Sequence, residues 1–384
     1  MSLSDATLYF DNNATTRIDP RVVEAMLPWL TDLYGNPSSG CQLGRQAARA
    51  VEHAREQVAA LLGCEPREIV FTSGGTESNN AAIASAVRLN PDRRHLLTTV
   101  VEHSAILKPC EALEREGYAI SRLFVEPEGQ LDMIDFERLI RPDTALVSVM
   151  AANNETGVLF PIRELAQIAR AKGVLFHTDA VQAAGKVPMH LSEWGISYMS
   201  VSGHKIHGPK GVGALYVNRR SGFRPSLSGG GQENGRRSGT ENVAGIVGFG
   251  QAAEQALQNL ERETTEVKGL RDTFERGILE RISGVSVSGG LAERLPNTTN
   301  LAFEGVEAEA ALLLLDRAGI CASAGSACMT GSLQPSHVLK AMGFSTERAR
   351  SSLRFSFSRF NTVKEIEKAL EILPGVMARL RGTP

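Results

Sequence analysis

The sequence predicts an α/β fold in which a large domain contains a mostly parallel sheet between helices and a smaller domain is α+β. Over roughly residues 15 to 250, short apolar runs alternate with helical patterns, as is typical of parallel strands covered on both faces. Glycines gather at the ends of these runs and mark the turns. Beyond this block the chain becomes long, charged and helical, which indicates a second kind of packing unit.

The elements are expected in the following order. In the first block, apolar runs predict strands at 68–72, 96–101, 145–150, 174–178, 198–202 and 214–217, and helical patterns lie at 81–88, 104–116 and 162–172. The second block contains a long helical stretch at 240–281, strands at 285–288 and 299–303, and helices at 307–318 and 363–381. Gly-rich stretches at 228–240 and 322–334 are expected to be mobile loops. We therefore predict a large domain, 15–255, and a small domain made of 1–14 and 256–384.

Composition excludes several function classes. The net charge of the 384 residues is −2, so the basic excess of a general nucleic-acid binder is absent. No apolar run approaches the roughly 18 residues needed to cross a bilayer, and the first residues do not resemble a secretory signal. Five cysteines, an odd number without a C-x-x-C pair, argue against a disulfide framework or a zinc site. We expect a cytoplasmic protein that binds neither nucleic acid nor membrane.

Lys205 is the first candidate for chemistry. It follows a predicted strand and precedes a turn rich in glycine and proline, whereas a lone lysine is usually a solvated surface residue. Ser202 and His204 supply polar groups just before it, and Gly208 and Gly211 allow a ligand to approach the backbone closely. A lysine that forms a Schiff base is a known solution for amine chemistry.

Asp179 ends an apolar strand, at the position where open α/β sheets bind ligands. Aspartate also suits a helix N-cap, so alone it would be ambiguous. Together with Lys205 it matches what a pyridoxal cofactor requires, because the lysine holds the aldehyde and the carboxylate keeps the pyridine nitrogen protonated. The Gly-rich turn 73–78 lies between a strand and a helix, where backbone N–H groups and the helix dipole favour a phosphate.

Motifs along almost the whole chain resemble the cysteine desulfurases of the NifS/IscS type, in the class V aminotransferase family of fold-type-I pyridoxal phosphate enzymes. The NifS branch is the nearer one because Thr-Glu-Asn follows Gly239. The matching segments are FDNNATT (10–16), YGNPSS (34–39), FTSGGTESNN (71–80), VEHSA (101–105), ANNETG (152–157), HTDAVQ (177–182), SGHKIHGPKG (202–211), GRRSGTENVAGIVGFG (235–250), GSAC (325–328), PSHVLKAMG (335–343) and LRFSFSRFNT (353–362).

The resemblance implies a role for each matching position. Lys205 would carry pyridoxal 5'-phosphate as a Schiff base, and Asp179 would pair with its ring nitrogen. The further cofactor contacts that the resemblance implies are Gln182, Asn154, His103, Gly75, Thr76, Ser202, Gly203 and His204. Thr240 would reach the phosphate of the neighbouring subunit, which implies a homodimer. Arg354 and Asn36 would hold the substrate carboxylate, with Asn154 nearby, and the planar fork of arginine suits two oxygens.

Several of these residues also have ordinary interpretations when each is taken alone. His103 could simply begin a helix before Ser104, and Arg354 could be an exposed charge on a strand. Asn36 precedes Pro37, which is a common turn signal. The combination of the motifs, and not any single residue, favours the catalytic interpretation.

Cys328 decides the chemistry. It lies in GSACMTGS, where small residues give a core thiol little to pack on, whereas Cys64, Cys110 and Cys321 are expected to be packed and inert. The resemblance implies that the loop at about 322–334 carries Cys328 between the cofactor and an acceptor protein, often an iron–sulfur scaffold. A transient metal contact through Cys328 in such a complex is a further expectation. The chain departs from the family at Cys41, where histidine is usual.

A second departure is Met329, which stands where serine or threonine is usual. The expected activity is removal of sulfur from L-cysteine, which gives alanine and a Cys328 persulfide, with Lys205 moving the Cα proton and His103 managing thiol protons. Two alternatives stay open. One is a selenocysteine lyase or an aminotransferase-like relative, and the other is a non-enzymatic pyridoxal-binding regulator or scaffold.

Overall fold

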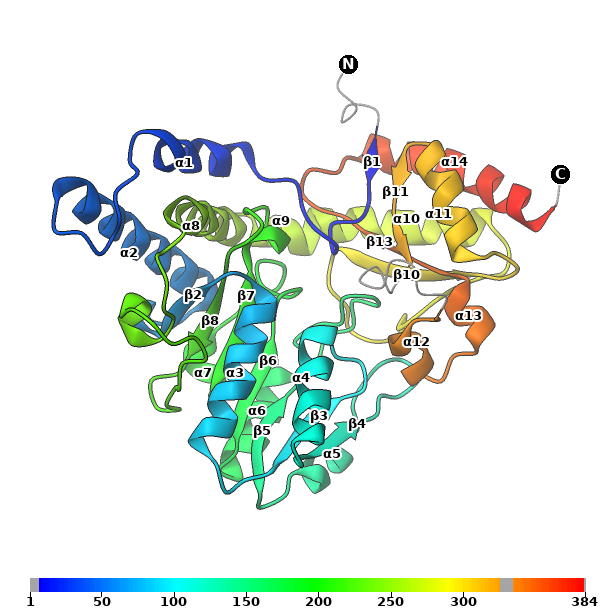
Figure 1. Ribbon diagram of the computed structural model, residues 1–384. Coiled ribbons are helices and arrows are strands. Elements are labelled where there is room, and N and C mark those ends of the chain that lie inside the picture. The colour runs from blue at the N-terminus through cyan, green and yellow to red at the C-terminus, as the bar shows by residue number, and fades with distance from the viewer. Residues whose placement is uncertain (1–6, 325–333, 383–384) are drawn as a thin grey trace.

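The computed structural model describes residues 7–324 and 334–382 (Figure 1). Its largest element is a seven-stranded sheet with the order β2-β8-β7-β6-β5-β3-β4, in which only β8 runs antiparallel to its neighbours. This confirms the predicted α/β class with a mostly parallel sheet. The strands are β2 (Ile69–Thr72), β3 (His95–Thr99), β4 (Ala119–Leu123), β5 (Thr144–Ser148), β6 (Leu175–Asp179), β7 (Tyr198–Ser202) and β8 (Gly213–Val217).

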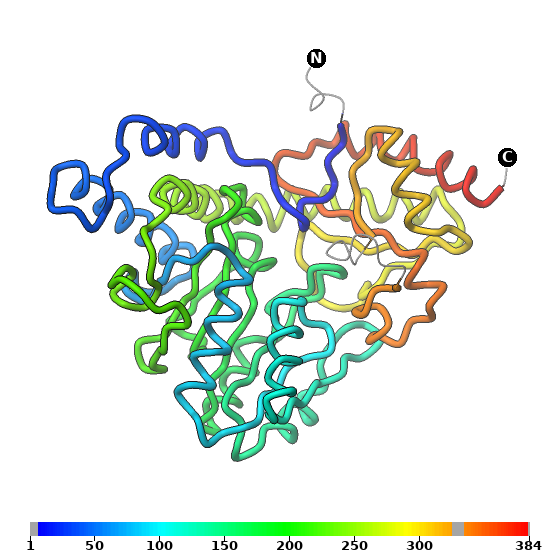
Figure 2. The backbone as a smooth tube through the Cα atoms, in the orientation of Figure 1, coloured from blue at the N-terminus to red at the C-terminus, as the bar shows by residue number. Residues whose placement is uncertain are grey.

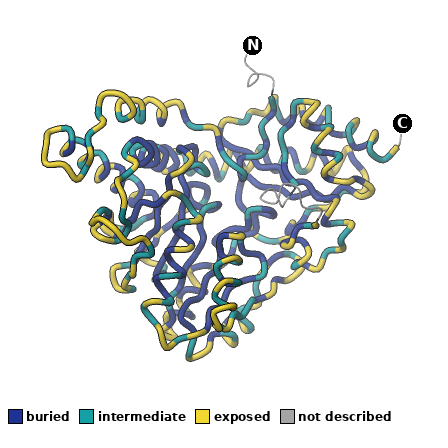
Figure 3. The backbone as a smooth tube through the Cα atoms, viewed as in Figure 1, coloured by how far each residue is buried: buried dark blue, intermediate teal, exposed yellow. Residues whose placement is uncertain are grey.

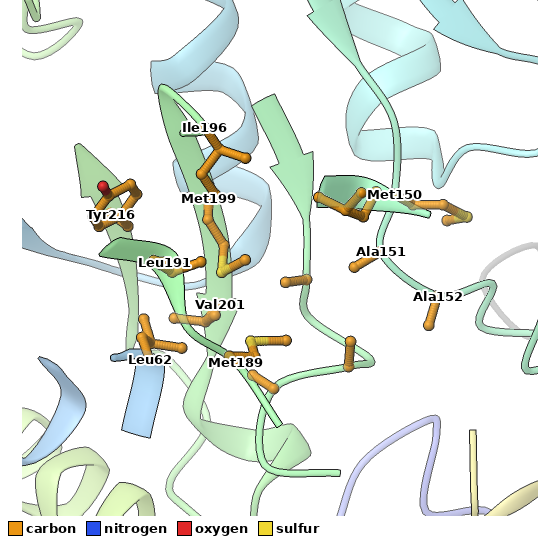
Figure 4. Packing of buried hydrophobic residues seen from close by; sticks show 14 of the residues in the cluster. Leu62, Met150, Ala151, Ala152, Met189, Leu191, Ile196, Met199, Val201 and Tyr216 are labelled. Carbon is orange, nitrogen blue, oxygen red and sulfur yellow. The ribbon is translucent and has the colours of Figure 1, made fainter. Parts of the chain in front are cut away.

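Helices cover both faces of this sheet. Leu146 and Leu215 pack against α3 (Gly75–Leu89) and α4 (Ser104–Arg115), whereas their strand neighbours Val147 and Tyr216 face the opposite core (Figure 4). Because successive strand residues point to opposite faces, burial on both faces explains the continuous apolar runs. The other helices of this part are α1 (Pro20–Thr31), α2 (Gln42–Leu62), α5 (Met133–Leu139), α6 (Ile162–Ala171), α7 (Leu191–Trp194) and α8 (Val243–Gln258).

A second, antiparallel sheet with the order β12-β13-β10-β9 packs against the later helices. Its strands are β9 (Val285–Val287), β10 (Thr298–Phe303), β12 (Ser323–Ala324) and β13 (Ser352–Ser356). The helices are α9 (Leu260–Arg262), α10 (Lys268–Arg281), α11 (Ala308–Arg317), α12 (His337–Ala341), α13 (Thr346–Arg350) and α14 (Val363–Arg381). Strand β1 (Leu8–Tyr9) pairs in parallel with β11 (Ile320–Cys321), so the start of the described chain lies among C-terminal elements (Figure 2).

An aromatic cluster holds the N-terminal segment in this second unit. The ring of Phe10 lies 5.9 Å from that of Phe274, which in turn lies 4.8 Å from Phe355. The chain then crosses to the large sheet, where the backbone N–H of Thr16 donates to the carbonyl of His204 at 3.0 Å. Residues 11–16, which we call the crossing segment, therefore bridge the two packing units.

The helices of the structure differ from the predicted ones mainly where glycines and polar surface residues interrupt the apolar pattern of the sequence. Helix α3 begins at Gly75, well before the expected 81–88 helix, because the polar Gly-rich turn itself forms the first helical turn. The expected helical stretch 240–281 is present, but it is interrupted by a π-turn at Glu263–Val267. Helices α1 and α2 were not predicted: α2 is polar over much of its length, and α1 contains the helix breaker Pro28.

The 228–240 segment is anchored more firmly than a mobile loop would be. Glu233 is buried within it, and its carboxylate receives two hydrogen bonds from the buried Arg55 at 2.7 and 2.8 Å. The backbone N–H of Phe71 in β2 donates to the same carboxylate at 2.9 Å. This ion pair therefore attaches the segment to the edge of the large sheet.

We expect Arg55→Met to lower the free energy of unfolding by about 3–5 kcal/mol, because it leaves the Glu233 carboxylate buried without its countercharge. The double variant Arg55→Met/Glu233→Gln should recover most of that loss, since no uncompensated charge is then buried. Urea unfolding of the two variants and the parent protein measures this. Equal losses in the single and double variants would contradict the expectation.

Candidate active site

The predicted site residues gather at one edge of the large sheet. Asp179 is the last residue of β6, Lys205 follows β7, His103 follows β3, and Asn154 follows β5 (Figure 1). These four strands are parallel, so their carboxyl ends meet at the same edge. Open α/β sheets bind ligands at this edge.

Lys205 ends a 3₁₀ turn (Gly203–Lys205) that directly follows β7. Its Nζ donates to the backbone carbonyls of Asn13 at 2.5 Å and Ala14 at 2.8 Å. The side-chain Nε2 of Gln182 donates to the same Asn13 carbonyl at 2.9 Å. The crossing segment therefore brings Lys205 and Gln182 together at one carbonyl.

Asp179 is a buried carboxylate held by neutral donors. Its Oδ2 accepts from Asn79 Nδ2 at 2.6 Å, and its Oδ1 accepts from the backbone N–H of Val181 at 3.0 Å. Within residues 7–324 and 334–382, no lysine, arginine or histidine forms an ion pair with it. A buried charge normally needs an opposite charge, so this carboxylate fits a cationic group such as a protonated pyridine nitrogen.

The Gly-rich turn forms a tight cradle at the start of α3. A Cβ on Gly75 would lie 2.6 Å from Val181 Cγ2, and a Cβ on Gly213 would lie 2.7 Å from Gly74 Cα. A Cβ on Gly74 would be 3.8 Å from the Oγ of Ser202. The helix start therefore lies beside the end of β7, and its first N–H groups have no intrahelical partner, which fits a phosphate.

Two further predicted phosphate contacts flank this cradle. Thr76 is the second residue of α3, and Gly203 begins the turn that ends at Lys205. Burial, followed by the charge of Lys205, lowers the pKa of His204 to about 4, so its ring is neutral at physiological pH. His204 Nδ1 lies 3.1 Å from Thr15 Oγ1, which attaches it to the crossing segment.

His103 is the N-cap of α4, so the helix-start interpretation describes its backbone correctly. Its Nδ1 accepts a hydrogen bond from the backbone N–H of Ala105 at 3.1 Å. A nitrogen that accepts cannot carry the ring proton, so the neutral ring has its proton on Nε2. The helix cap therefore leaves Nε2–H as the donor that the neutral His103 ring can offer on its other side.

Glu102, beside His103, is a site residue that the sequence analysis missed. It is fully buried, and its Oε1 accepts from Thr99 Oγ1 at 2.8 Å and from the backbone N–H of Met150 at 2.9 Å. Burial is the main cause that raises its pKa to about 8, and the charge of Asp179 adds to this. The only sequence signal is an acid directly before His103, and burial of that acid is not visible in the sequence.

The raised pKa predicts a pH dependence of stability. Between the ordinary value of 4.5 and about 8, the unfolded chain loses the Glu102 proton while the folded chain keeps it, so stability falls as pH rises. We expect Glu102→Gln to remove this part of the fall, roughly 2–4 kcal/mol between pH 5 and pH 8. Urea unfolding of both proteins at several pH values measures it, and identical pH slopes would contradict a protonated Glu102.

Arg354 is buried on β13, so the interpretation as an exposed strand charge is wrong. Its Nη1 donates to the carbonyl of Asn154 at 2.9 Å, and its Nη2 donates to Asp11 Oδ1 at 2.7 Å. Its Nε has no hydrogen-bond partner among the described residues. Arg354 thus lies beside Asn154, with one donor still available for a ligand oxygen.

Asn36 and Thr240 lie in exposed loops. Asn36 stands between α1 and α2, where its Oδ1 accepts from the backbone N–H of Ser38 at 2.9 Å. Thr240 closely follows Arg237, which donates twice to Glu77 of α3, at 2.9 and 3.2 Å. In the part of the chain that the structure describes, neither forms a hydrogen bond with Lys205 or Asp179.

Cys328 and Met329 lie outside the described residues. Burial raises the pKa of Cys110 to about 12, and it also raises the pKa of Cys64 and Cys321, so these thiols are poor nucleophiles. Cys41 is exposed at the N-cap of α2. Over the described ranges, no cluster of three or more His, Cys, Asp or Glu residues could hold a metal ion, and no helix is long and apolar enough to cross a membrane.

A lysine, a helix start that fits an anion, and a buried carboxylate without a cationic partner among the described residues lie at one sheet edge of this α/β fold. This is the class of fold-type-I pyridoxal phosphate enzymes. The chain belongs to the class-V aminotransferase family, whose pattern it matches over residues 8–369. Members of this family use pyridoxal phosphate.

Named relatives confirm the resemblance to NifS. The chain is 52% identical to proteins named cysteine desulfurase from Nostoc and cysteine desulfurase NifS from Azotobacter vinelandii, and in both cases the match covers 98% of this chain and 94% of the relative. A solved NifS-like protein superimposes with a TM-score of 0.91 at 38% identity, over 97% of this chain and all of the other. A structure titled SspA in complex with cysteine has a TM-score of 0.82 at 36% identity and covers 93% of this chain and all of SspA.

Proposed function

We propose that this protein is a cysteine desulfurase that uses pyridoxal 5'-phosphate to convert L-cysteine into alanine and a protein-bound persulfide. The observation that carries the proposal is the meeting of Lys205, Gln182 and Asp179 at one sheet edge, beside the Gly-rich helix start. Support also comes from the 52% identity to cysteine desulfurases over nearly the whole chain.

The residues at this edge suit the parts of the cofactor. Lys205 would hold its aldehyde, and Asp179 would hold the proton on its ring nitrogen. Gln182 would donate to its ring oxygen, and His103 would stack on the ring. The phosphate would lie against Gly75, Thr76, Ser202, Gly203 and His204. When bound, the cofactor supplies an electron sink for negative charge at the substrate Cα.

The protein's own groups then move the protons and orient the substrate. The Lys205 amine takes the proton from the substrate Cα, since an amine can act as a base when it is uncharged. The Arg354 Nε and the Asn154 side chain would hold the substrate carboxylate, together with Asn36. His103 would face the substrate thiol with Nε2–H, which can donate to the sulfur, because its Nδ1 accepts the helix-cap bond. The ring would take up a thiol proton only at Nδ1, by giving up that bond.

Cys328 would accept the sulfur. Its thiolate attacks the sulfur of the substrate, so an S–S bond forms while the bond between that sulfur and the substrate Cβ breaks, and protonation of the carbon product yields alanine. The persulfide then passes to an acceptor, and the relationship to NifS favours an iron–sulfur scaffold protein. A metal contact of Cys328 would arise only within that complex.

We also propose that the protein works as a homodimer. Helix α1 and the turn after it expose Val23, Leu27, Leu30 and Tyr34 at 49, 56, 65 and 77% of their surfaces (Figure 3). A second copy would cover such an apolar stripe. Thr240 is exposed as well, as expected of a residue that would contact the cofactor phosphate in the neighbouring subunit. Sedimentation analysis should give twice the chain mass.

The division into domains 15–255 and 1–14 with 256–384 is likewise a proposal. It is supported by the separate core around Phe10, Phe274 and Phe355. Leu339 and Met342, however, pack in the core of the large sheet, so the second unit is not independent of the first. A cytoplasmic location is proposed from the free thiols of the described cysteines.

Assays on the purified protein test the function. After incubation with pyridoxal phosphate, we expect a visible absorption band and, with L-cysteine and a thiol reductant, equal amounts of alanine and sulfide. A keto acid in place of alanine would indicate a transaminase. Turnover of selenocysteine alone would indicate a selenocysteine lyase, and cofactor binding without turnover of any amino acid would indicate a regulator.

A further inference from the structure

A second lysine, Lys186, is buried behind Lys205, and the proposed mechanism does not use it. Only 5% of its surface is exposed. Its Nζ donates to the backbone carbonyl of Gln182 at 2.9 Å and to the side-chain Oε1 of Gln182 at 3.3 Å. Both bonds end on the residue whose other amide atom, Nε2, shares the Asn13 carbonyl with Lys205.

The backbone fixes Lys186 in this place. The preceding residue, Gly185, has φ +73°, and a Cβ there would lie 2.9 Å from Ile206 and 3.0 Å from Ala256. Glycine is therefore required, and the turn that carries Lys186 cannot shift without disturbing α8. Lys186 is thus held against Gln182 by packing that does not involve its own side chain.

A small cavity of about 10 Å³ is lined in part by Lys186, Lys205, Glu263 and Arg359. Glu263 and Arg359 are also buried, and Arg359 pairs with Asp19 at 3.0 Å. Glu263 stands in the π-turn that interrupts the long helical stretch, and such turns are frequent at functional sites. Burial and the charge of Lys205 lower the pKa of Lys186 to about 7, whereas Glu263 opposes this decrease.

We propose that Lys186 is a positioning residue that fixes the orientation of the Gln182 side-chain amide, and that it thereby sets how tightly pyridoxal phosphate is held. The proposal rests on the proposed function, because it concerns the cofactor of that reaction. Charged or neutral, the Lys186 nitrogen has the two N–H donors that its bonds to Gln182 need. The amide must then turn its oxygen to Lys186 and its N–H donors to the side of the Asn13 carbonyl, which Lys205 also contacts.

The direction of the amide matters because of the group it would meet. The ring oxygen of pyridoxal phosphate is an acceptor when it is ionised, so it needs a donor from Gln182. Without Lys186, only the bond from Nε2 to the Asn13 carbonyl would hold the amide in this direction, so the rotated amide, whose oxygen would repel the ring oxygen, would become more populated. The contribution of Lys186 should therefore vanish when Gln182 has no amide to orient.

A double-mutant cycle on cofactor affinity tests this dependence. Apo forms of the parent protein, Lys186→Met, Gln182→Met and the double variant are titrated with pyridoxal phosphate. We expect Lys186→Met to weaken binding about tenfold when Gln182 is present, and less than about twofold in the Gln182→Met background. No change, or the same loss in both backgrounds, would overturn the proposal.

The absorption spectrum of the bound cofactor gives a second test of the proposal. The pH midpoint of the visible band of the bound cofactor should move upward by about one unit in Lys186→Met, because the ionised ring oxygen loses a fixed donor. The same substitution in the Gln182→Met background should leave the midpoint where Gln182→Met alone puts it. A shift of equal size in both backgrounds would also overturn the proposal.

Two controls keep the outcome interpretable. If Lys186→Met does not fold, Lys186→Gln retains volume and hydrogen bonding but can face the Gln182 amide in either direction, and it should also weaken binding. Lys210→Met, at an exposed lysine nearby, should bind as the parent does. A parent protein that binds no pyridoxal phosphate would refute the proposed function, whereas a normal parent with an unaffected Lys186→Met refutes only the role of Lys186.

Discussion

Lys205→Ala is expected to abolish turnover of cysteine, with a loss of at least roughly 10³-fold, because the substitution removes both the amine that holds the cofactor and the base for the Cα proton. It should also remove the visible absorption band that the parent protein shows with pyridoxal phosphate. Cofactor absorbance and alanine production, measured on the same preparations, test both losses together.

The structure supplies a matched control for this substitution. Lys210 lies five positions after Lys205 but is exposed, so Lys210→Ala should keep both the absorption band and the activity. Lys205 Nζ also bonds to the carbonyls of Asn13 and Ala14, so its loss could loosen the crossing segment. Urea unfolding separates that effect from chemistry. A Lys205→Ala protein with the parent's band and turnover would eliminate the proposed mechanism.

The central strands were predictable because they are buried on both faces. β7 occupies the range expected from its apolar run, and β6 is displaced by one residue. By contrast, β4 was missed because its residues are only partly buried and include Ser121 and Arg122, so no apolar run marks it. β1 and β11 are two-residue strands, and pairing across more than 300 residues leaves no local pattern.

Lys205 and Asp179 could be predicted as site residues because both stand at strand ends and together suit one cofactor, although each alone has an ordinary interpretation. The parallel sheet brings their strands side by side. Glu102 and Lys186 could not be found in the same way, because the local sequence does not show that their side chains are buried. For Arg354, the sequence did not show whether the side chain is exposed or buried. In the structure the side chain is buried and paired with Asp11.

The crossing segment at residues 11–16 shows why the two packing units depend on each other. The Nδ2 of Asn13 donates to the carbonyl of Asn154 and to Thr298 Oγ1. The backbone carbonyl of Asn13 accepts a hydrogen bond from Lys205 Nζ. Asn297 Nδ2 also donates to Asn13 Oδ1 at 3.0 Å. The side chain and the backbone carbonyl of Asn13 thus connect the second sheet with the edge of the first sheet where Lys205 lies. The sequence shows FDNNATT only as a matching motif, without this connecting role.

Cys328→Ala should separate the two halves of the reaction. We expect the variant to bind pyridoxal phosphate as the parent does, since none of the proposed cofactor contacts includes Cys328. Release of sulfide from cysteine should fall at least roughly 10²-fold, because no thiolate remains to attack the substrate sulfur. Absorbance titration and a sulfide assay, run on one preparation, measure the two properties.

Cys321→Ala is the matched control, because that thiol lies seven positions earlier, is partly buried in β11, and has a pKa raised by burial. It should retain both cofactor binding and sulfide release. Full activity of Cys328→Ala on cysteine would refute the desulfurase mechanism. Retained turnover of selenocysteine, with cysteine turnover lost, would not refute it, since selenium leaves more readily than sulfur and needs no attacking thiol. The ratio of the two activities in this single variant therefore distinguishes sulfur transfer through Cys328 from elimination that bypasses it.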